Sequence, residues 1–300
     1  TQILNNMKIK HLLCFIALCL FFTPGKAQQL SVMTLRNGAT VYIWEDKSKP
    51  DVFGMIAFKV GSVDDPEQYT GLAHYLEHVM FKGTQTIDAL DWEKEKPVYE
   101  KIIAKYDERA ALSDPAAREA IDKEINDLTR EAAQYAAGNE FSLLVDHMGG
   151  QGLNASTGYD QTEYHNSFPP SQLEKWLEIY SERLIDPVFR GFQTELEAVY
   201  EEYNMYNDDR GSRMREFIYE QAFGDHPYAR PIIGLPEHLK NPQLSKLIDF
   251  YNTWYGPQNM SIILVGNIDA KEAIPMIRDK FERVPRRAEI DREQKPVRQL

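Results

Sequence analysis

The stretch of sequence that decides the fold runs Gly71-Leu72-Ala73-His74-Tyr75-Leu76-Glu77-His78-Val79-Met80-Phe81. Its apolar residues surround most of a helical axis, which predicts a helix that Thr70 caps and that is buried inside a domain. On such a helix His74 and His78 lie one turn apart on one face, so both imidazoles can reach one metal ion. Glu77 lies beside them, close enough to accept a proton from a water at the metal. The pattern therefore predicts two metal ligands and a general base.

The alternative interpretation is that His74 and His78 are ordinary core residues. Burying two imidazoles and a carboxylate within one helical turn is costly unless the charges are paired or bound to a metal. The group of three therefore favours a metal site over core packing. A catalytic zinc site also needs a third protein ligand and an open position for water, and this stretch does not contain the third ligand.

The beginning of the chain has the layout of a targeting segment. Residues 1–6 precede Met7 and resemble untranslated upstream sequence. Residues 7–27 have the basic start, the apolar run and the small residues before a cleavage site that are typical of a signal peptide. The apolar run is too short to span a bilayer comfortably, and we expect no integral membrane span once it is removed. The sequence thus predicts an exported protein, either periplasmic or secreted.

Both cysteines, Cys14 and Cys19, lie inside the predicted signal peptide. The mature chain therefore has no thiol that could act as a nucleophile, a metal ligand or half of a disulfide. Lipidation of Cys19 is the alternative, but the preceding Leu18 is not the small residue that this modification favours.

Composition and charge exclude one class of partner. The chain is 43% hydrophobic and 27% charged, which is ordinary for a soluble globular protein. Its formal net charge is -12, and removing Lys8, Lys10 and Lys26 with the signal peptide makes the mature chain more acidic still. An acidic surface repels phosphate backbones, so we expect no nucleic-acid partner.

The mature chain reads as one mixed domain over residues 28–285. Segments 30–36 and 39–44 flank Asn37-Gly38, a dipeptide typical of a tight hairpin turn. Residues 52–60 and 261–266 predict further strands, and 149–164 predicts a loop that enters an edge strand. Helical patterns follow Pro170, cover about 192–207, and continue to Phe223. This order predicts an α+β fold: a two-layer domain with a mainly antiparallel sheet packed against helices.

A charged helical hairpin interrupts this domain. Residues 92–111 and 115–138 are rich in Glu, Lys, Arg and Ala, and Ser113-Asp114-Pro115 between them supplies a stop, a cap and a first helical position. We therefore predict two antiparallel helices with solvated faces in this region.

Three blocks of the sequence carry a family likeness: Gly61-Ser62-Val63-Asp64-Asp65-Pro66, Gly71 to His78, and Phe81-Lys82-Gly83-Thr84. Together they resemble the pitrilysin and insulysin metallopeptidases, the inverzincins, which carry the zinc motif in the order His-x-x-Glu-His. The likeness is greatest to the bacterial branch that is similar to the mitochondrial processing peptidase, and it extends from the first hairpin to about Pro285.

The resemblance implies roles for residues outside the helix. Glu202 matches the family's third zinc ligand, and Glu195, seven positions earlier, matches a glutamate that supports the site from behind the ligands. The alternative is an acidic helix without such roles, since Glu197 and Glu201 are also present. At the edge strand, the resemblance assigns contacts with the substrate backbone to Asn154 and Ala155.

One departure from the family is an insertion of about fifty residues between His78 and Glu202. The charged hairpin, residues 91–139, accounts for it. Because it falls between two matching blocks, it need not disturb the metal ligands. It is either inert or a lid or docking arm.

Together these features predict a zinc-dependent endopeptidase that hydrolyses peptides or small unfolded proteins. Zn²⁺ held by His74, His78 and Glu202 would activate a water, and Glu77 would accept its proton. The alternative is a non-catalytic scaffold or peptide-binding subunit of a related two-domain assembly. The resemblance also implies a related C-terminal domain or partner subunit, and we interpret residues 286–300 as a linker toward that missing second domain.

Overall fold

A computed structural model describes residues 29–290 and residue 292 of the chain. The predicted upstream residues 1–6, the signal peptide 7–27 and most of the predicted linker 286–300 lie outside these residues. The described part of the linker packs on the domain, because the guanidinium of Arg287 lies over the ring of Tyr251 and that of Arg292 over the ring of Trp254.

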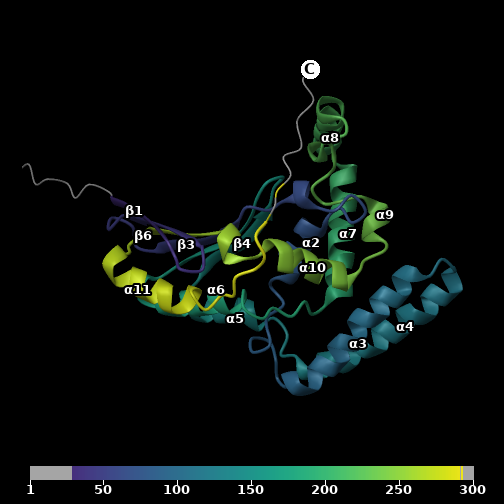
Figure 1. The fold of residues 1–300 in the computed structure, drawn as a ribbon, viewed down its shortest axis with the longest axis horizontal. Coiled ribbons are helices and arrows are strands. Elements are labelled where there is room, and N and C mark those ends of the chain that lie inside the picture. The colour runs from purple at the N-terminus through teal and green to yellow at the C-terminus, as the bar shows by residue number, and fades with distance from the viewer. Residues whose placement is uncertain (1–28, 291, 293–300) are drawn as a thin grey trace, which may run out of the picture.

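A six-stranded mixed sheet forms one end of the molecule (Figure 1). The pairing of β2 (Thr40–Glu45) with β6 (Met260–Gly266) is the only parallel one in the sheet as described, and the other four pairings are antiparallel. The predicted α+β class with a mainly antiparallel sheet is confirmed. In spatial order the strands are β1 (Gln29–Thr34), β2 (Thr40–Glu45), β6 (Met260–Gly266), β3 (Val52–Phe58), β5 (Thr162–Phe168) and β4 (Gln151–Thr157).

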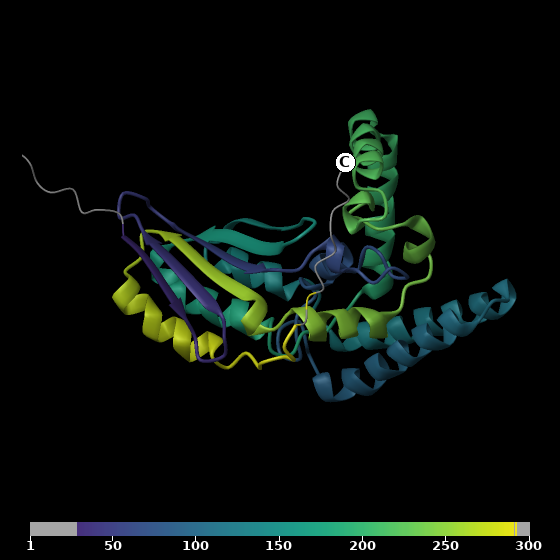
Figure 2. The same cartoon turned by 45° about the horizontal axis from the view of Figure 1, so that its top comes forward.

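Helices cover one face of this sheet and leave the other open (Figures 1 and 2). The covering helices are α5 (Glu140–His147), α6 (Leu173–Glu182) and α11 (Ala270–Phe281). Alternate side chains of β3 and β5 are buried under them, as expected for a sheet with one covered face. The open face carries exposed apolar side chains on β1, β2 and β6: Leu30, Val32, Tyr42, Trp44 and Val265.

A group of helices lies beside the sheet (Figure 1). The central one is α2 (Leu72–Val79), which packs against α7 (Phe192–Asp208) and against β4. The other members are α8 (Arg210–Phe223), α9 (Pro236–Leu239) and α10 (Leu244–Trp254). Within the described residues, no helix is long and apolar enough to cross a membrane.

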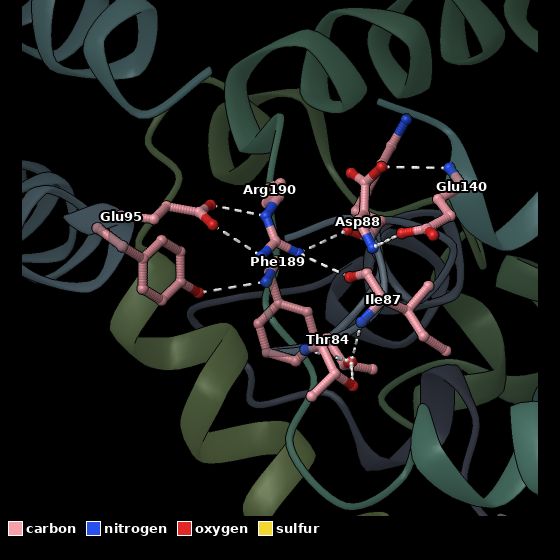
Figure 3. A network of polar contacts seen from close by, with 10 residues as sticks. Thr84, Ile87, Asp88, Glu95, Glu140, Phe189 and Arg190 are labelled. Carbon is pink, nitrogen blue, oxygen red and sulfur yellow. Dashed lines mark hydrogen bonds and ion pairs between the residues drawn. The ribbon is translucent and has the colours of Figure 1, made fainter. Parts of the chain in front are cut away.

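The charged hairpin consists of α3 (Trp92–Ala111) and α4 (Pro115–Ala132), and it projects from the helical end (Figures 1 and 2). A buried ion pair fixes its base: both Glu95 carboxylate oxygens bind the guanidinium of Arg190, at 2.6 and 2.8 Å (Figure 3). Arg190 also donates to the carbonyl of Lys82, which follows α2. The hairpin is therefore tied both to the segment after α2 and to the residues just before α7.

Thr70 does not cap α2, so that prediction is wrong. The N-cap is Gly71, whose φ of 89° lies in the left-handed region that favours glycine. A Cβ there would lie 2.5 Å from the carbonyl oxygen of Ile233. The Thr70 hydroxyl contacts the segment that follows Ile233 instead of the helix. It accepts a hydrogen bond from the backbone N–H of Leu235 and lies 2.8 Å from Nδ1 of His238.

The contact between the sheet and α6 yields a stability prediction. Oδ1 of buried Asn166 on β5 accepts hydrogen bonds from Nε1 of Trp176 (2.8 Å) and the hydroxyl of Tyr180 (2.7 Å). Asn166→Ala leaves both donors buried without a partner, so we expect the free energy of unfolding to fall by about 2–4 kcal/mol in urea denaturation. Asn126→Ala, on an exposed face of α4, is the control and should change it by less than about 0.5 kcal/mol. Equal stability of the two variants would contradict this role.

Candidate metal centre and active site

The helix that carries the predicted motif is held at both ends. At its start, the Asp65 carboxylate accepts hydrogen bonds from the backbone N–H groups of Gly71 (2.7 Å) and Ala73 (2.9 Å). At its end, Nη2 of Arg183 donates to the carbonyl of Met80 at 3.0 Å. Arg183 is itself buried among aromatic rings. These contacts fix the direction in which the side chains of α2 point.

His74, His78 and Glu202 converge on one point. Nε2 of His74 lies 3.6 Å and Nε2 of His78 lies 3.5 Å from Oε2 of Glu202. One potential ligand atom from each residue lies within 4.8 Å of the others. Two imidazole nitrogens and a carboxylate oxygen are a donor set that suits a catalytic zinc, with the fourth position left for water.

Glu195 contacts His78 on the side of the ring opposite Glu202. Its Oε2 lies 3.5 Å from Nδ1 of His78, the ring nitrogen that points away from Glu202, and its Oε1 lies 2.5 Å from Nζ of Lys82. A carboxylate in this position fixes the tautomer and orientation of a ligand histidine. Glu201, the alternative from the acidic helix, lines a different cavity between α7 and the α3–α4 hairpin.

The two histidines differ in their protonation. Burial lowers the pKa of His74 to about 4, so its ring is neutral and can bind a metal. Burial also acts to lower the pKa of His78, but hydrogen bonds with Glu195 and Glu202 outweigh it and raise that pKa to about 9. The hydrogen bond with His78 in turn lowers the pKa of Glu202. Without a metal, a proton on His78 therefore balances the carboxylates.

Glu77 is near the converging donors but is not one of them. It lines a cleft of about 460 Å³ together with His74, Glu202 and residues from β4, α8 and the 231–233 segment. Its Oε2 accepts a hydrogen bond of 2.6 Å from Oγ1 of Thr157. Burial raises the pKa of the Glu77 carboxyl. A carboxylate with a raised pKa beside a metal site suits a group that accepts and returns a proton.

The edge strand β4 forms one wall of the cleft. Ala155, Ser156 and Thr157 line it, whereas Asn154 is exposed and does not. β4 pairs with β5 on one side and lies at the end of the sheet. Ala155 is thus beside the candidate ligands, and Asn154 is on the adjoining part of the strand.

A family model with the description Insulinase (Peptidase family M16) matches residues 40–97 and 128–235, more than half of the chain. The chain belongs to this family. A second model, with the description Peptidase M16 inactive domain, matches residues 243–300. The resemblance to pitrilysin and insulysin is confirmed, and the branch similar to the mitochondrial processing peptidase stays a prediction.

Two relatives in the M16 family are bacterial. The probable zinc protease PqqL of Escherichia coli is 25% identical over 270 residues, which cover 86% of this chain and 23% of PqqL. The zinc protease PqqE of Helicobacter pylori is 24% identical over 254 residues, which cover 83% of this chain and 46% of PqqE. The chain therefore spans less than half the length of either relative.

Solved structures of M16 peptidases share the fold. The periplasmic protease PqqL from Escherichia coli matches with a TM-score of 0.68 at 24% identity, over 90% of this chain and 26% of that one. Pitrilysin matches with a TM-score of 0.66 at 22% identity, over 91% of this chain and 25% of that one.

Sequence reasoning missed three residues of the site. Lys82 follows the end of α2 and binds Glu195, and Tyr206 lies one turn beyond Glu202 on α7, with which it forms a hydrogen bond. Spacing on a helix could have suggested Tyr206, whereas Lys82 lies beyond the end of its helix. Thr157 comes from a strand, so no spacing within the motif predicts its contact with Glu77.

If His78 is a zinc ligand, its pKa makes zinc binding depend on pH. Because this pKa is about 9, His78 is protonated at neutral pH and must lose its proton to bind zinc. The apparent zinc affinity should rise about tenfold per pH unit from pH 6.5 to 8.5, as measured by competition with a chelator. Glu195→Gln removes a partner that raises this pKa, so the proton competes less with zinc and the rise in affinity should level off at lower pH than in the wild type. An affinity independent of pH in both proteins would contradict the assignment of His78 as a ligand.

Proposed function

We propose that this chain is the metal-binding part of an exported zinc metalloendopeptidase that hydrolyses peptides or small unfolded proteins. The observation that carries the proposal is the convergence of His74, His78 and Glu202, with Glu77 beside them in an open cleft. The names of the relatives PqqL and PqqE, both zinc proteases, support zinc as the metal.

Two imidazole nitrogens and one carboxylate oxygen are ligands that zinc prefers, so the three residues fit this metal by their chemistry. His74, His78 and Glu202 would hold the ion, and Glu195 would orient His78 through Nδ1. Zinc bound there supplies a Lewis acid that polarises a water and the carbonyl of a peptide bond. His74 is already neutral, which suits a ligand, and deprotonation of His78 completes the set.

The chain's own residues perform the remaining steps. The edge of β4 binds an extended peptide by backbone pairing, which tolerates many substrate sequences, and Asn154 and Ala155 contact its backbone. Glu77 accepts a proton from the attacking water and returns it to the nitrogen of the leaving amine. No covalent intermediate with the protein is required.

The alternative is a non-catalytic scaffold or peptide-binding subunit. All the proposed site residues lie within 40–97 and 128–235, the segments that the insulinase model matches. The model described as an inactive domain begins only at residue 243. The full set of donors together with Glu77 favours catalysis over a scaffold role.

Three features of the whole protein are part of the proposal. Export of the chain by residues 7–27 agrees with the periplasmic location of the relative PqqL from Escherichia coli. A related second domain or partner subunit would cover the open, apolar face of the sheet, where Trp44 and its neighbours are exposed. The hairpin 91–139 is an insertion, and the insulinase model leaves residues 98–127 within it unmatched.

Substitutions at the site separate metal binding from catalysis. Glu77→Gln should keep one zinc per chain and lower the rate of peptide cleavage by at least about a hundredfold, because the proton acceptor is lost. His74→Ala and Glu202→Ala should lower both zinc content and cleavage, because each removes a ligand. Metal analysis and a peptide cleavage assay, with chelator-treated protein as a control, check these outcomes. A Glu77→Gln protein that cleaves at the wild-type rate would refute the assignment of the base.

A further inference from the structure

Thr157 contacts the proposed general base from a different element. Its Oγ1 donates a hydrogen bond to Oε2 of Glu77 at 2.6 Å. Among the residues that the structure describes, no other group donates a hydrogen bond to the Glu77 carboxylate. Hydrogen bonds to a carboxylate are shorter and stronger than those between neutral groups. We propose that Thr157 is a positioning residue that holds Oε2 of Glu77 and leaves Oε1 to take the proton from water. The proposal rests on the proposed role of Glu77.

Thr157 can hold Glu77 because its own backbone is anchored. It is the last residue of β4 and pairs with Thr162 of β5. The turn that follows is closed by a hydrogen bond of 2.8 Å from the N–H of Gly158 to the carbonyl of Gln161. The N–H of Ser62 donates to the carbonyl of Gly158 at 3.1 Å and ties this turn to the loop before α2. The Thr157 hydroxyl is therefore presented from a fixed point.

Glu77 needs such a partner because of its surroundings. Burial raises the pKa of its carboxyl, and the hydrogen bond from Thr157 and the charge of His78 oppose this rise, whereas the charges of Glu202 and Glu163 add to it. The Glu77 side chain lines a cleft, so rotation about its own bonds can carry the carboxylate away from the metal donors. A single donor on one oxygen restrains that rotation and leaves the other oxygen free.

The same strand would bind the substrate. Ala155 and Thr157 are two positions apart on β4, so their side chains point to the same face, and both line the cleft. A peptide that pairs with the edge of β4 is therefore placed by the strand that also orients the base. Thr157 thus links substrate position to base position.

The direct test is the position of the Glu77 carboxylate in crystal structures of the zinc-loaded wild type, Thr157→Val and Thr157→Ser. Valine keeps the shape of threonine but lacks the hydroxyl, and serine keeps the hydroxyl. We expect the carboxylate to leave its position in Thr157→Val and to keep it in Thr157→Ser. An unmoved carboxylate in Thr157→Val would overturn the proposal.

Kinetics of the same variants measure the consequence. Thr157→Val should lower kcat for peptide cleavage by about ten- to a hundredfold, with KM, zinc content and Tm unchanged, because only the orientation of the base is lost. Thr157→Ser should stay within about threefold of the wild-type kcat. A loss confined to KM, or an equal loss in both variants, would contradict the role of the hydroxyl. If the wild type cleaves no better than Glu77→Gln, the proposed function fails, while the crystal structures still decide the role of Thr157.

Discussion

The candidate active site depends on two helices from distant parts of the chain that bring electron-donating groups to one point. His74 and His78 on α2 and Glu202 on α7 all direct donor atoms inward, and such atoms do not attract one another. A cation is what makes the arrangement favourable. The pKa of His78, about 9, reflects this need for a positive charge. In the absence of a metal, the carboxylates of Glu195 and Glu202 keep a proton on the His78 ring. A metal ion would supply that positive charge in place of the proton.

The rest of the structure holds α2 and α7 in this relation. The hydroxyl of Tyr75 on α2 donates to the carbonyl of Phe192 at the start of α7, and Lys82 binds Glu195 across the same interface. Arg190 joins the base of the charged hairpin to the residues before α7 through Glu95 (Figure 3). At its base the hairpin therefore has a structural role, because its first helix, α3, is bound to the residues just before α7, the helix that carries Glu202.

The sequence predicted the parts of the site that lie on one helix. His74, Glu77 and His78 followed from helical spacing, whereas Glu202 and Glu195 required the resemblance to a family, since many acidic residues share α7. The hairpin of β1 and β2 followed from Asn37-Gly38, but the parallel pairing of β2 with β6 joins segments too distant for a local pattern to show. The prediction that Thr70 caps α2 was wrong for a similar reason. The Thr70 hydroxyl accepts a hydrogen bond from Leu235, which is distant in the sequence.

The central claim is that α2 and α7 form a zinc site with the base outside the coordination shell. Anomalous diffraction at the zinc edge, on crystals of the zinc-loaded protein, tests it most directly. We expect one peak at about 2.0–2.2 Å from Nε2 of His74, Nε2 of His78 and a carboxylate oxygen of Glu202. Glu77 should lie beyond bonding distance from that peak. No peak at this point, or a peak coordinated by Glu77 in place of Glu202, would contradict the account.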